Sequence, residues 1–337
     1  TPTPTPTQYE SSYPPPFRHD DAAAAAPGAS PADPDPMADA DLPAIDLREL
    51  DPGALAAACR EWGIFQLGNH GIPPPLSRRI HGEARRLLSL PFEAKRALFA
   101  GTPVAYFWGT PAVTHRVRDL NWLEGLHVPL HHLRAPPPGS DPDSGDISHL
   151  RGLAAEYGRR AAGVATALLE PLATDLGLGG GQLRASFPSD AGGLLRLFRY
   201  PRCPDPGRHL GMDPHTDSSV LTLVSQDEAG GLQVRRPGQP WLRVNPVPGS
   251  LVVIVGDMLQ AMSDDEYRSP EHRVVVGSGG KERVSVCYFA FPPEDGPIRS
   301  SRYREFTYKE FRAKVVEDIG AVGFKVGLER FRISDSL

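Results

Sequence analysis

The spacing of hydrophobic residues along the chain changes after residue 187. Before that point apolar residues recur at helical intervals, and after it they alternate with a period of two, which is typical of strands. We therefore predict an α+β protein in which a helical scaffold precedes a β-rich core. Many short strands separated by Pro/Gly turns favour a sandwich or a barrel, and a jelly roll (double-stranded β-helix) is the version that holds a site in its mouth.

The N-terminal half carries the helical patterns. The predicted elements are helices at residues 53–61, 74–90 and 149–176 and a short strand at residues 64–67. Asp51 and Pro52 favour the first helix start, because Asp caps a helix N-terminus well and Pro fits the first turn. Gly63 ends this helix, and the run 177–181 ends the third. We expect a kink or a break at Pro171, because proline removes a backbone donor and clashes with the preceding turn.

The second half carries the period-two pattern and then one more helical stretch. The predicted strands cover residues 194–200, 220–226, 232–235, 241–244, 251–255, 272–276 and 283–291. A final helix is predicted at residues 308–319. The pattern divides the chain into an N-terminal region (37–187), a jelly-roll core (188–295) and a C-terminal helix and tail (296–337).

Residues 1–36 consist of Thr-Pro repeats followed by Tyr/Pro and Ala/Pro/Asp segments. Such a composition buries too little apolar surface to offset the entropy of the chain, so we predict a disordered tail. Deleting this tail is therefore expected to leave activity and melting temperature nearly unchanged.

Composition excludes several classes of function. The chain has 337 residues with a net charge of −5, and its 36 basic and 41 acidic residues are mixed, so no nucleic-acid-binding patch is visible. The longest aliphatic run, 251–255, is far too short to cross a membrane. Cys59, Cys203 and Cys287 are widely spaced, which argues against a disulfide framework. We predict a monomer in a reducing compartment, the cytoplasm, with the nucleus as an alternative.

Candidate metal ligands stand where two of the predicted strands begin. His215 and Asp217 precede the run 220–224, and on one strand residues two apart project to the same face. A second His-x-Asp pair, His19-Asp20-Asp21, lies in the tail, which cannot support a site. His272 opens a later strand. Two histidines and one carboxylate, with three coordination positions left open, form the facial triad of non-haem Fe(II) oxygenases.

A candidate anion site lies eleven residues beyond His272. Arg283 and Ser285 share one face of a predicted strand. A guanidinium fork beside a hydroxyl suits the far carboxylate of a dicarboxylic co-substrate, because the planar group pairs with both carboxylate oxygens.

This arrangement, His215-x-Asp217, then His272, then Arg283-x-Ser285, resembles the signature of plant 2-oxoglutarate/Fe(II)-dependent dioxygenases. The similarity covers roughly residues 42–330. Three further stretches resemble the N-terminal landmarks of that family, namely residues 42–47, 62–73 and 91–95.

The resemblance implies a reaction and its cofactors. We expect Fe(II) held by the triad, 2-oxoglutarate held by Arg283 and Ser285, O2 as the oxidant and ascorbate as the reductant. The products would be an oxidised small molecule, succinate and CO2. Residues 195–201 are similar to the family's Arg-x-Asn-x-Tyr-Pro strand, which places Tyr200 near the co-substrate. Phe198 replaces the family's Asn, so one polar contact is missing and the ring becomes a pocket wall.

Three stretches, residues 106–111, 121–125 and 326–331, look most like the gibberellin-oxidising branch, in particular gibberellin 2-oxidase-like enzymes. The implied substrate is a gibberellin in an apolar pocket with a cation for its carboxylate. The candidate pocket residues are Phe107, Trp108, Trp122 and Phe198, and the candidate cations are Arg116, Arg118 and Arg134. Auxin, a flavonoid or another specialised metabolite is the alternative within the same chemistry. The alternative from another class is a hormone-binding relative without catalysis.

Overall fold

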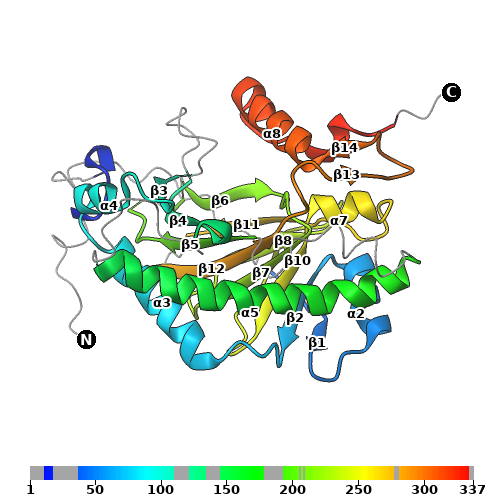
Figure 1. The fold of residues 1–337 in the computed structure, drawn as a ribbon, viewed down its shortest axis with the longest axis horizontal. Helices are drawn as coiled ribbons and strands as arrows, with labels where there is room; N and C mark the ends of the chain where they lie inside the picture. Colours follow the sequence, from blue (N-terminus) through cyan, green and yellow to red (C-terminus); the bar gives the residue numbers. More distant parts are fainter. Residues whose placement is uncertain are drawn as a thin grey trace.

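The structure is a computed structural model, and it describes residues 11–17, 37–109, 121–133, 145–177, 193–204, 206–207, 209–276 and 281–333. Two facing β-sheets form its centre (Figure 1). The larger sheet has the strand order β1-β2-β10-β7-β12-β5-β4-β3, and the smaller has the order β6-β11-β8-β9. Apart from the parallel pair β1–β2, the strands of both sheets pair antiparallel. This is the predicted jelly-roll core with helices around it.

The strands of the two sheets are β1 (Ala44–Asp46), β2 (Ile64–Gly68), β3 (Ala105–Trp108), β4 (Glu124–Pro129), β5 (Leu194–Tyr200), β6 (Leu210–His215), β7 (Leu221–Gln226), β8 (Leu232–Arg235), β9 (Leu242–Arg243), β10 (Leu251–Val255), β11 (Glu271–Val275) and β12 (Arg283–Ala290). A separate hairpin consists of β13 (Pro297–Ile298) and β14 (Phe306–Thr307).

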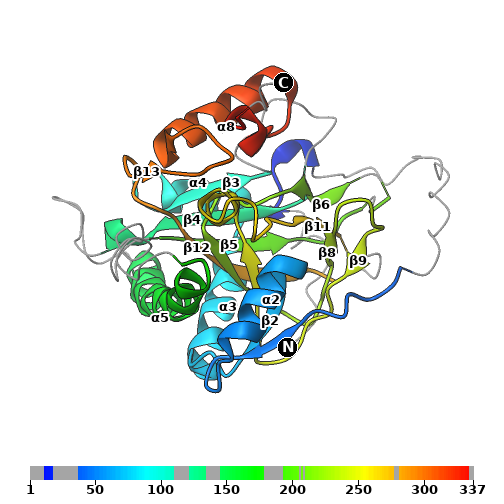
Figure 2. The same ribbon diagram turned by 90° about the vertical axis from the view of Figure 1, so that its right-hand side faces the viewer.

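The α-helices are α2 (Pro52–Glu61), α3 (Pro74–Leu88), α4 (Phe92–Phe99), α5 (Gly145–Asp175), α7 (Asp257–Met262) and α8 (Tyr308–Val322). Short 3₁₀ turns are η1 (Pro15–Phe17), η3 (Leu130–Leu133) and η4 (Gly327–Arg330). Helices α2, α3 and α5 pack along one face of the large sheet, and α8 lies on the far side of the molecule (Figures 1 and 2).

Successive side chains of a strand point alternately into two different hydrophobic clusters. On β12, Val284 and Val286 face the core cluster that includes α2, α3 and α5. Cys287 and Phe289 belong instead to a second cluster between the two sheets. Because successive side chains of a strand point to opposite faces, the polar residues Arg283 and Ser285 face the same way as Cys287. The space between the two sheets is therefore the place where polar side chains can form a functional site.

Most predicted elements match, but the helical predictions needed three corrections. Asp51 caps α2 as expected, accepting hydrogen bonds from the amides of Gly53 and Ala54. The second predicted helix is α3, which ends two residues earlier than predicted, and helix α4 after it was not predicted. Helix α7 was missed. Helix α5 is not broken at Pro171 but continues to Asp175, since the flanking Leu168, Leu169, Leu172 and Ala173 are buried and their packing outweighs the local cost of proline.

The expected N-terminal region also contributes strands. β1 and β2 lie at one end of the large sheet and β4 and β3 at the other, so residues before 187 complete the sheet that the core begins. Strands β3 and β4 were not predicted. The four-part division of the chain stays a prediction. Among the described residues no helix is both long and apolar enough to cross a membrane. The three cysteines are buried, and they form no disulfide within the described part of the chain.

Part of the N-terminal tail is packed, contrary to the expectation that it adds nothing to the core. Within residues 1–36 the structure describes 11–17, and there Tyr13 is only 6% exposed. Its ring lies 5.7 Å from that of Trp108 and 5.8 Å from that of Trp122, and its hydroxyl donates to the carbonyl of Arg202 at 2.9 Å. The prediction rested on the Thr/Pro/Ala composition of the tail as a whole. It overlooked two aromatic side chains, Tyr13 and Phe17, that can anchor the tail.

Candidate metal centre and co-substrate pocket

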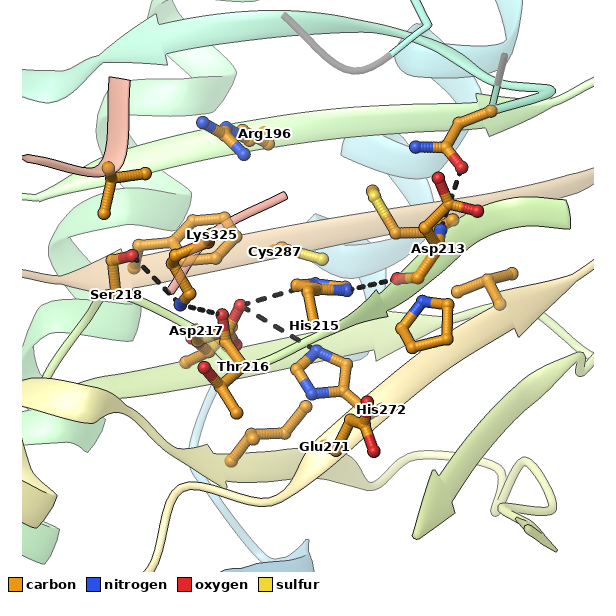
Figure 3. Close-up of a pocket in the computed structure, with 18 of the residues that line it drawn as sticks. Arg196, Asp213, His215, Thr216, Asp217, Ser218, Glu271, His272, Cys287 and Lys325 are labelled. Carbon is orange, nitrogen blue, oxygen red and sulfur yellow. Dashed lines mark hydrogen bonds and ion pairs between the residues drawn. The ribbon is translucent and has the colours of Figure 1, made fainter. Parts of the chain in front are cut away.

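Two histidines and one aspartate converge in the space between the sheets. His272 on β11 pairs directly with His215, the last residue of β6, and their ring centres are 4.3 Å apart. The Oδ1 atom of Asp217 lies 3.8 Å from the Nε2 atom of each histidine (Figure 3). Candidate ligand atoms of the three residues all lie within 4.8 Å of one another. The structure therefore brings together the three predicted ligands.

The local reason for this convergence differs from the one predicted. His215 and Asp217 do not share a strand, because β6 ends at His215 and β7 begins at Leu221. Asp217 lies in the loop between them. The amide of Asp257, the first residue of α7, donates to the Asp217 carbonyl at 2.7 Å and helps to hold the loop. The aspartate thus meets the histidines through a bend in the chain and not through strand alternation.

The donor set fits a divalent iron. The Oδ2 atom of Asp217 is buried and has no hydrogen-bond partner. The Nδ1 atom of His215 faces the Asp213 carbonyl at 2.7 Å, and that of His272 faces the Pro270 carbonyl at 3.2 Å. A carbonyl can only accept, so each Nδ1 carries the proton and each Nε2 keeps its lone pair for a ligand. Nitrogen and carboxylate donors in this ratio suit Fe(II).

Electrostatics favour the ligand forms of these residues. Burial, helped by the neighbouring His272, lowers the pKa of His215 to about 3, so its imidazole is neutral at physiological pH. Burial alone would raise the pKa of Asp217, but the two histidines lower it, so the carboxylate is ionised. The site therefore presents an ionised carboxylate beside the neutral imidazole of His215.

The triad lines a cavity of about 810 Å³ that is walled by both sheets and by α8. Its apolar lining includes Met212, Val224, Leu232, Ile254, Val274, Phe289, Phe291, Val315 and Ile319. Its polar lining includes the three candidate ligands, Arg283 and Ser285. A volume of this size accommodates a small-molecule ligand.

Arg283 and Ser285 form a cationic corner of this cavity. The Nη1 atom of Arg283 donates to the Ser285 hydroxyl at 3.1 Å, and its Nη2 atom donates to Gln226 Oε1 at 3.2 Å. The Nε atom is buried and has no hydrogen-bond partner. Tyr200, which also lines the cavity, lies opposite Arg283 in the β12–β5 pair. A buried arginine with an unused donor beside a hydroxyl is suited to a carboxylate.

The predicted substrate-pocket residues separate into two groups. Phe198 lines the cavity, and Phe107 lies beside it on the same face of the large sheet, with ring centres 6.0 Å apart. Trp108 and Trp122 are not among the described residues that line the cavity; they form a separate aromatic cluster with Tyr13 and Phe17. The structure does not support a pocket role for either tryptophan. The candidate cations Arg116, Arg118 and Arg134 lie outside the described residues.

The sequence interpretation assigned no role to Arg196, which lies on β5 two residues before Phe198, although it belongs to the motif at residues 195–201. It lines the cavity, and its Nε atom is buried without a hydrogen-bond partner among the described residues. Burial lowers its pKa, and its guanidinium carbon lies 5.3 Å from the centre of the Phe289 ring. Figure 3 shows it in the same cavity as Asp217 and the two histidines. Counting back in steps of two from Tyr200 would have found it.

Comparisons with known proteins agree with this geometry. Residues 191–292 match the 2OG-Fe(II) oxygenase superfamily, and residues 42–145 match the N-terminal model described as non-haem dioxygenase in morphine synthesis. Gibberellin 2-beta-dioxygenase 6 of Oryza sativa subsp. japonica is 40% identical over 86% of this chain and 85% of its own length. Gibberellin 2-beta-dioxygenase 8 of Arabidopsis thaliana is 36% identical over 86% and 87%.

Two solved structures share the fold at appreciable identity. The crystal structure of JOX2 in complex with 2OG, Fe and JA has a TM-score of 0.70 and 30% identity, covering 82% of this chain and 85% of that one. The structure of a dioxygenase for auxin oxidation in rice has a TM-score of 0.67 and 27% identity, covering 87% and 100%.

Proposed function

Because this chain belongs to the 2-oxoglutarate- and Fe(II)-dependent oxygenase superfamily, we propose that it oxidises a gibberellin, with release of succinate and CO2. The similarity to gibberellin 2-beta-dioxygenases supports the substrate class. The single observation that carries the proposal in the structure is Arg196, a half-buried cation that lines the same cavity as the metal ligands. A small hydrophobic acid is the chemistry that matches such a cavity.

His215, Asp217 and His272 would hold the iron on one face and leave its other positions open. Fe(II) bound there couples the activation of O2 to the oxidative decarboxylation of 2-oxoglutarate. The protein contributes the neutral Nε2 atoms of the two histidines, each oriented by a backbone carbonyl behind its ring. It also places the carboxylate of Asp217, which is 6% exposed, where water competes little for it.

Arg283 and Ser285 would bind the far carboxylate of 2-oxoglutarate. The Tyr200 ring lies 4.7 Å from the guanidinium carbon of Arg283 and limits the orientations of that side chain. Phe198, in the position of the family's Asn, gives the cavity a ring where a polar group is expected. Co-substrate affinity therefore depends on Arg283 and Ser285 without help from that position.

Arg196 would bind the carboxylate of the substrate. Arg312, at the α8 side of the cavity, already pairs with Glu294, whereas the Nε atom of Arg196 has no hydrogen-bond partner. With its carboxylate anchored on β5, the hydrocarbon part of the acid would pack on the apolar lining. Its reacting carbon would then lie over the open face of the iron site, so position more than chemistry determines which C–H bond is oxidised.

Other acids are the alternative within the same chemistry. The rice dioxygenase for auxin oxidation and JOX2 have similar folds, and Arg196 would serve any carboxylate of suitable size. A flavonoid lacks a carboxylate for Arg196 and fits less well. The hormone-binding alternative without catalysis fits less well, because all three side chains of the triad are present. We further propose that the enzyme acts as a monomer in the cytoplasm, which light scattering and cell fractionation would test.

The test is a substrate panel with paired acids and methyl esters. Succinate formation from 2-oxoglutarate is measured with Fe(II) and ascorbate while gibberellins, auxin and jasmonate are added in turn. We expect one gibberellin to stimulate turnover and its methyl ester to raise the KM by about tenfold or more, because a charge-assisted hydrogen bond contributes about 1.5–3 kcal/mol. Arg196→Gln should raise the KM of the acid but not that of 2-oxoglutarate.

Arg159→Gln, on the exposed face of α5, is the matched control and should behave like the wild type. Equal KM values for acid and ester would show that Arg196 does not bind the carboxylate of the substrate. Absence of stimulation by every compound, together with tight binding of one of them, would favour the hormone-binding alternative.

A further inference from the structure

The segment that follows α8 returns to the metal-binding loop. Gly323 ends the helix in the left-handed conformation (φ 86°), and residues 324–326 then line the cavity. Lys325 extends from this segment towards the loop, and its side chain is 13% exposed. Its Nζ atom donates to the Thr216 carbonyl at 2.5 Å (Figure 3). It also forms an ion pair with Asp257 Oδ2 at 2.7 Å. The ammonium therefore contacts two different elements beside the site.

Both elements touched by Lys325 determine where Asp217 sits. Thr216 is the residue between the ligands His215 and Asp217, and its carbonyl accepts from the ammonium. The carboxylate of Asp257 forms the ion pair with Lys325, and the backbone amide of Asp257 donates to the Asp217 carbonyl at 2.7 Å. One side chain thus joins the loop and the start of α7 that clamps it. It does so from a part of the chain more than a hundred residues away.

The position of Lys325 is itself fixed by a buried carboxylate. Asp318, on α8 and 1% exposed, accepts from the amide of Val326 at 3.1 Å and from the Nε atom of Arg330 at 2.8 Å. A buried carboxylate keeps such partners because leaving it unpaired is costly. Residues 323–331 are therefore folded around Asp318, with Lys325 aimed at the loop.

We infer that Lys325 is a positioning residue for the metal centre, which ties iron affinity to the docking of residues 323–331 although none of them is a ligand. This inference rests on the proposed triad. The ammonium satisfies the Thr216 carbonyl and draws Asp257 against the loop. Without it the loop loses one of its two contacts near Thr216 and Asp217, and the Asp257 amide still holds the Asp217 carbonyl. Residues that orient metal ligands typically change metal affinity by about 10–100-fold when replaced.

The experiment measures the Kd of Fe(II) for the full-length metal-free protein under anaerobic conditions. Lys325→Met keeps much of the length of the side chain but removes its charge and its donors. We expect at least about a tenfold rise in Kd, with Lys325→Arg recovering part of the loss because it can still donate to the Thr216 carbonyl. Lys314→Met is the matched control, because Lys314 pairs with Glu317 on the exposed face of α8 and its loss should leave the Kd unchanged.

Parallel melting curves of the metal-free variants separate positioning from general stability. A wild-type Kd in Lys325→Met would overturn the inference. So would a rise in Kd that Lys325→Arg does not reduce at all. If Lys325→Met does not fold, Asp318→Asn takes its place, because it loosens the anchor of the same segment; it should also raise the Kd, and an unchanged Kd would overturn the inference. The variant His272→Ala distinguishes the two proposals. If it still binds iron, the assignment of the triad is wrong. If it loses iron while Lys325→Met keeps the wild-type Kd, only the role of Lys325 is contradicted.

Discussion

Arg283 lies directly opposite Tyr200 in the antiparallel pair of β12 and β5, with its guanidinium carbon 4.7 Å from the centre of the tyrosine ring. The ring and the Ser285 hydroxyl hold the guanidinium, whose buried Nε donor has no hydrogen-bond partner among the described residues. Co-substrate binding and metal binding are therefore assigned to different residues of one cavity, and they can be tested separately.

Replacing Arg283 should weaken 2-oxoglutarate binding and spare iron. Arg283→Gln removes the charge but keeps some hydrogen bonding, and a charge-assisted bond contributes about 1.5–3 kcal/mol. The Kd of 2-oxoglutarate should therefore rise by about tenfold to more than a hundredfold. Arg283→Lys should recover only part of this, because an ammonium lacks the planar fork. Calorimetric titration measures both affinities; a change confined to substrate choice would mean that β12 faces the substrate.

Removing Tyr13 should destabilise the protein, in contrast to the expectation from composition. Its ring packs on Trp108 and Trp122, and truncating a buried aromatic side chain costs about 3 kcal/mol or more. Tyr13→Ala should lower the melting temperature by at least about 4 °C. Tyr13→Phe keeps the ring and loses only the hydrogen bond to the Arg202 carbonyl, so its effect should be clearly smaller. Equal, negligible effects of both variants would show that residues 11–17 do not pack in solution.

Stability should fall in mild acid because of buried histidines. Burial lowers the pKa of His81, whose Nε2 atom lies 2.9 Å from the Ser225 hydroxyl, to about 4, and burial likewise lowers that of His127 to about 4. The unfolded chain takes up these protons near pH 6.5. Between about pH 6.5 and 4 the unfolded state therefore binds more protons, and stability decreases as pH falls, by up to about 3 kcal/mol for His81.

Above pH 6.5 these histidines should contribute no pH dependence. His81→Gln keeps a polar partner for Ser225 and should remove only part of the acid-dependent loss, since His127 and His215, whose pKa values are also lowered, remain. Urea unfolding at a series of pH values measures this slope. A slope identical to that of the wild type would exclude His81 as its source.

The strands that the sequence predicted well are rich in aliphatic and β-branched residues. β8 and β10 have the predicted bounds, and β12 differs by one residue. β6 was missed because Leu210–His215 contains Gly, Asp and Pro, which are poor strand formers, and its pairing with β11 overrides that preference. Local composition cannot reveal such pairing, because the partner strand lies about sixty residues away.

Some residues of the candidate site could likewise be predicted from the sequence, and others could not. The triad and the Arg283–Ser285 pair could be predicted because their spacing is fixed by the chemistry they serve. Trp108 and Trp122 could not be distinguished from core residues, since an aromatic side chain is equally suited to a substrate pocket and to packing. Lys325 had no signal at all, because its role depends on how the C-terminal segment folds back over the loop.

The most direct test of the whole account is a comparison of His272→Ala and Asp217→Ala with His149→Ala, an exposed histidine on α5. Bound iron and substrate-stimulated succinate formation are measured on the same samples. The account predicts that both ligand variants lose turnover and bind iron weakly, while His149→Ala matches the wild type. Substantial turnover with bound iron in either ligand variant would contradict the assignment of the metal centre.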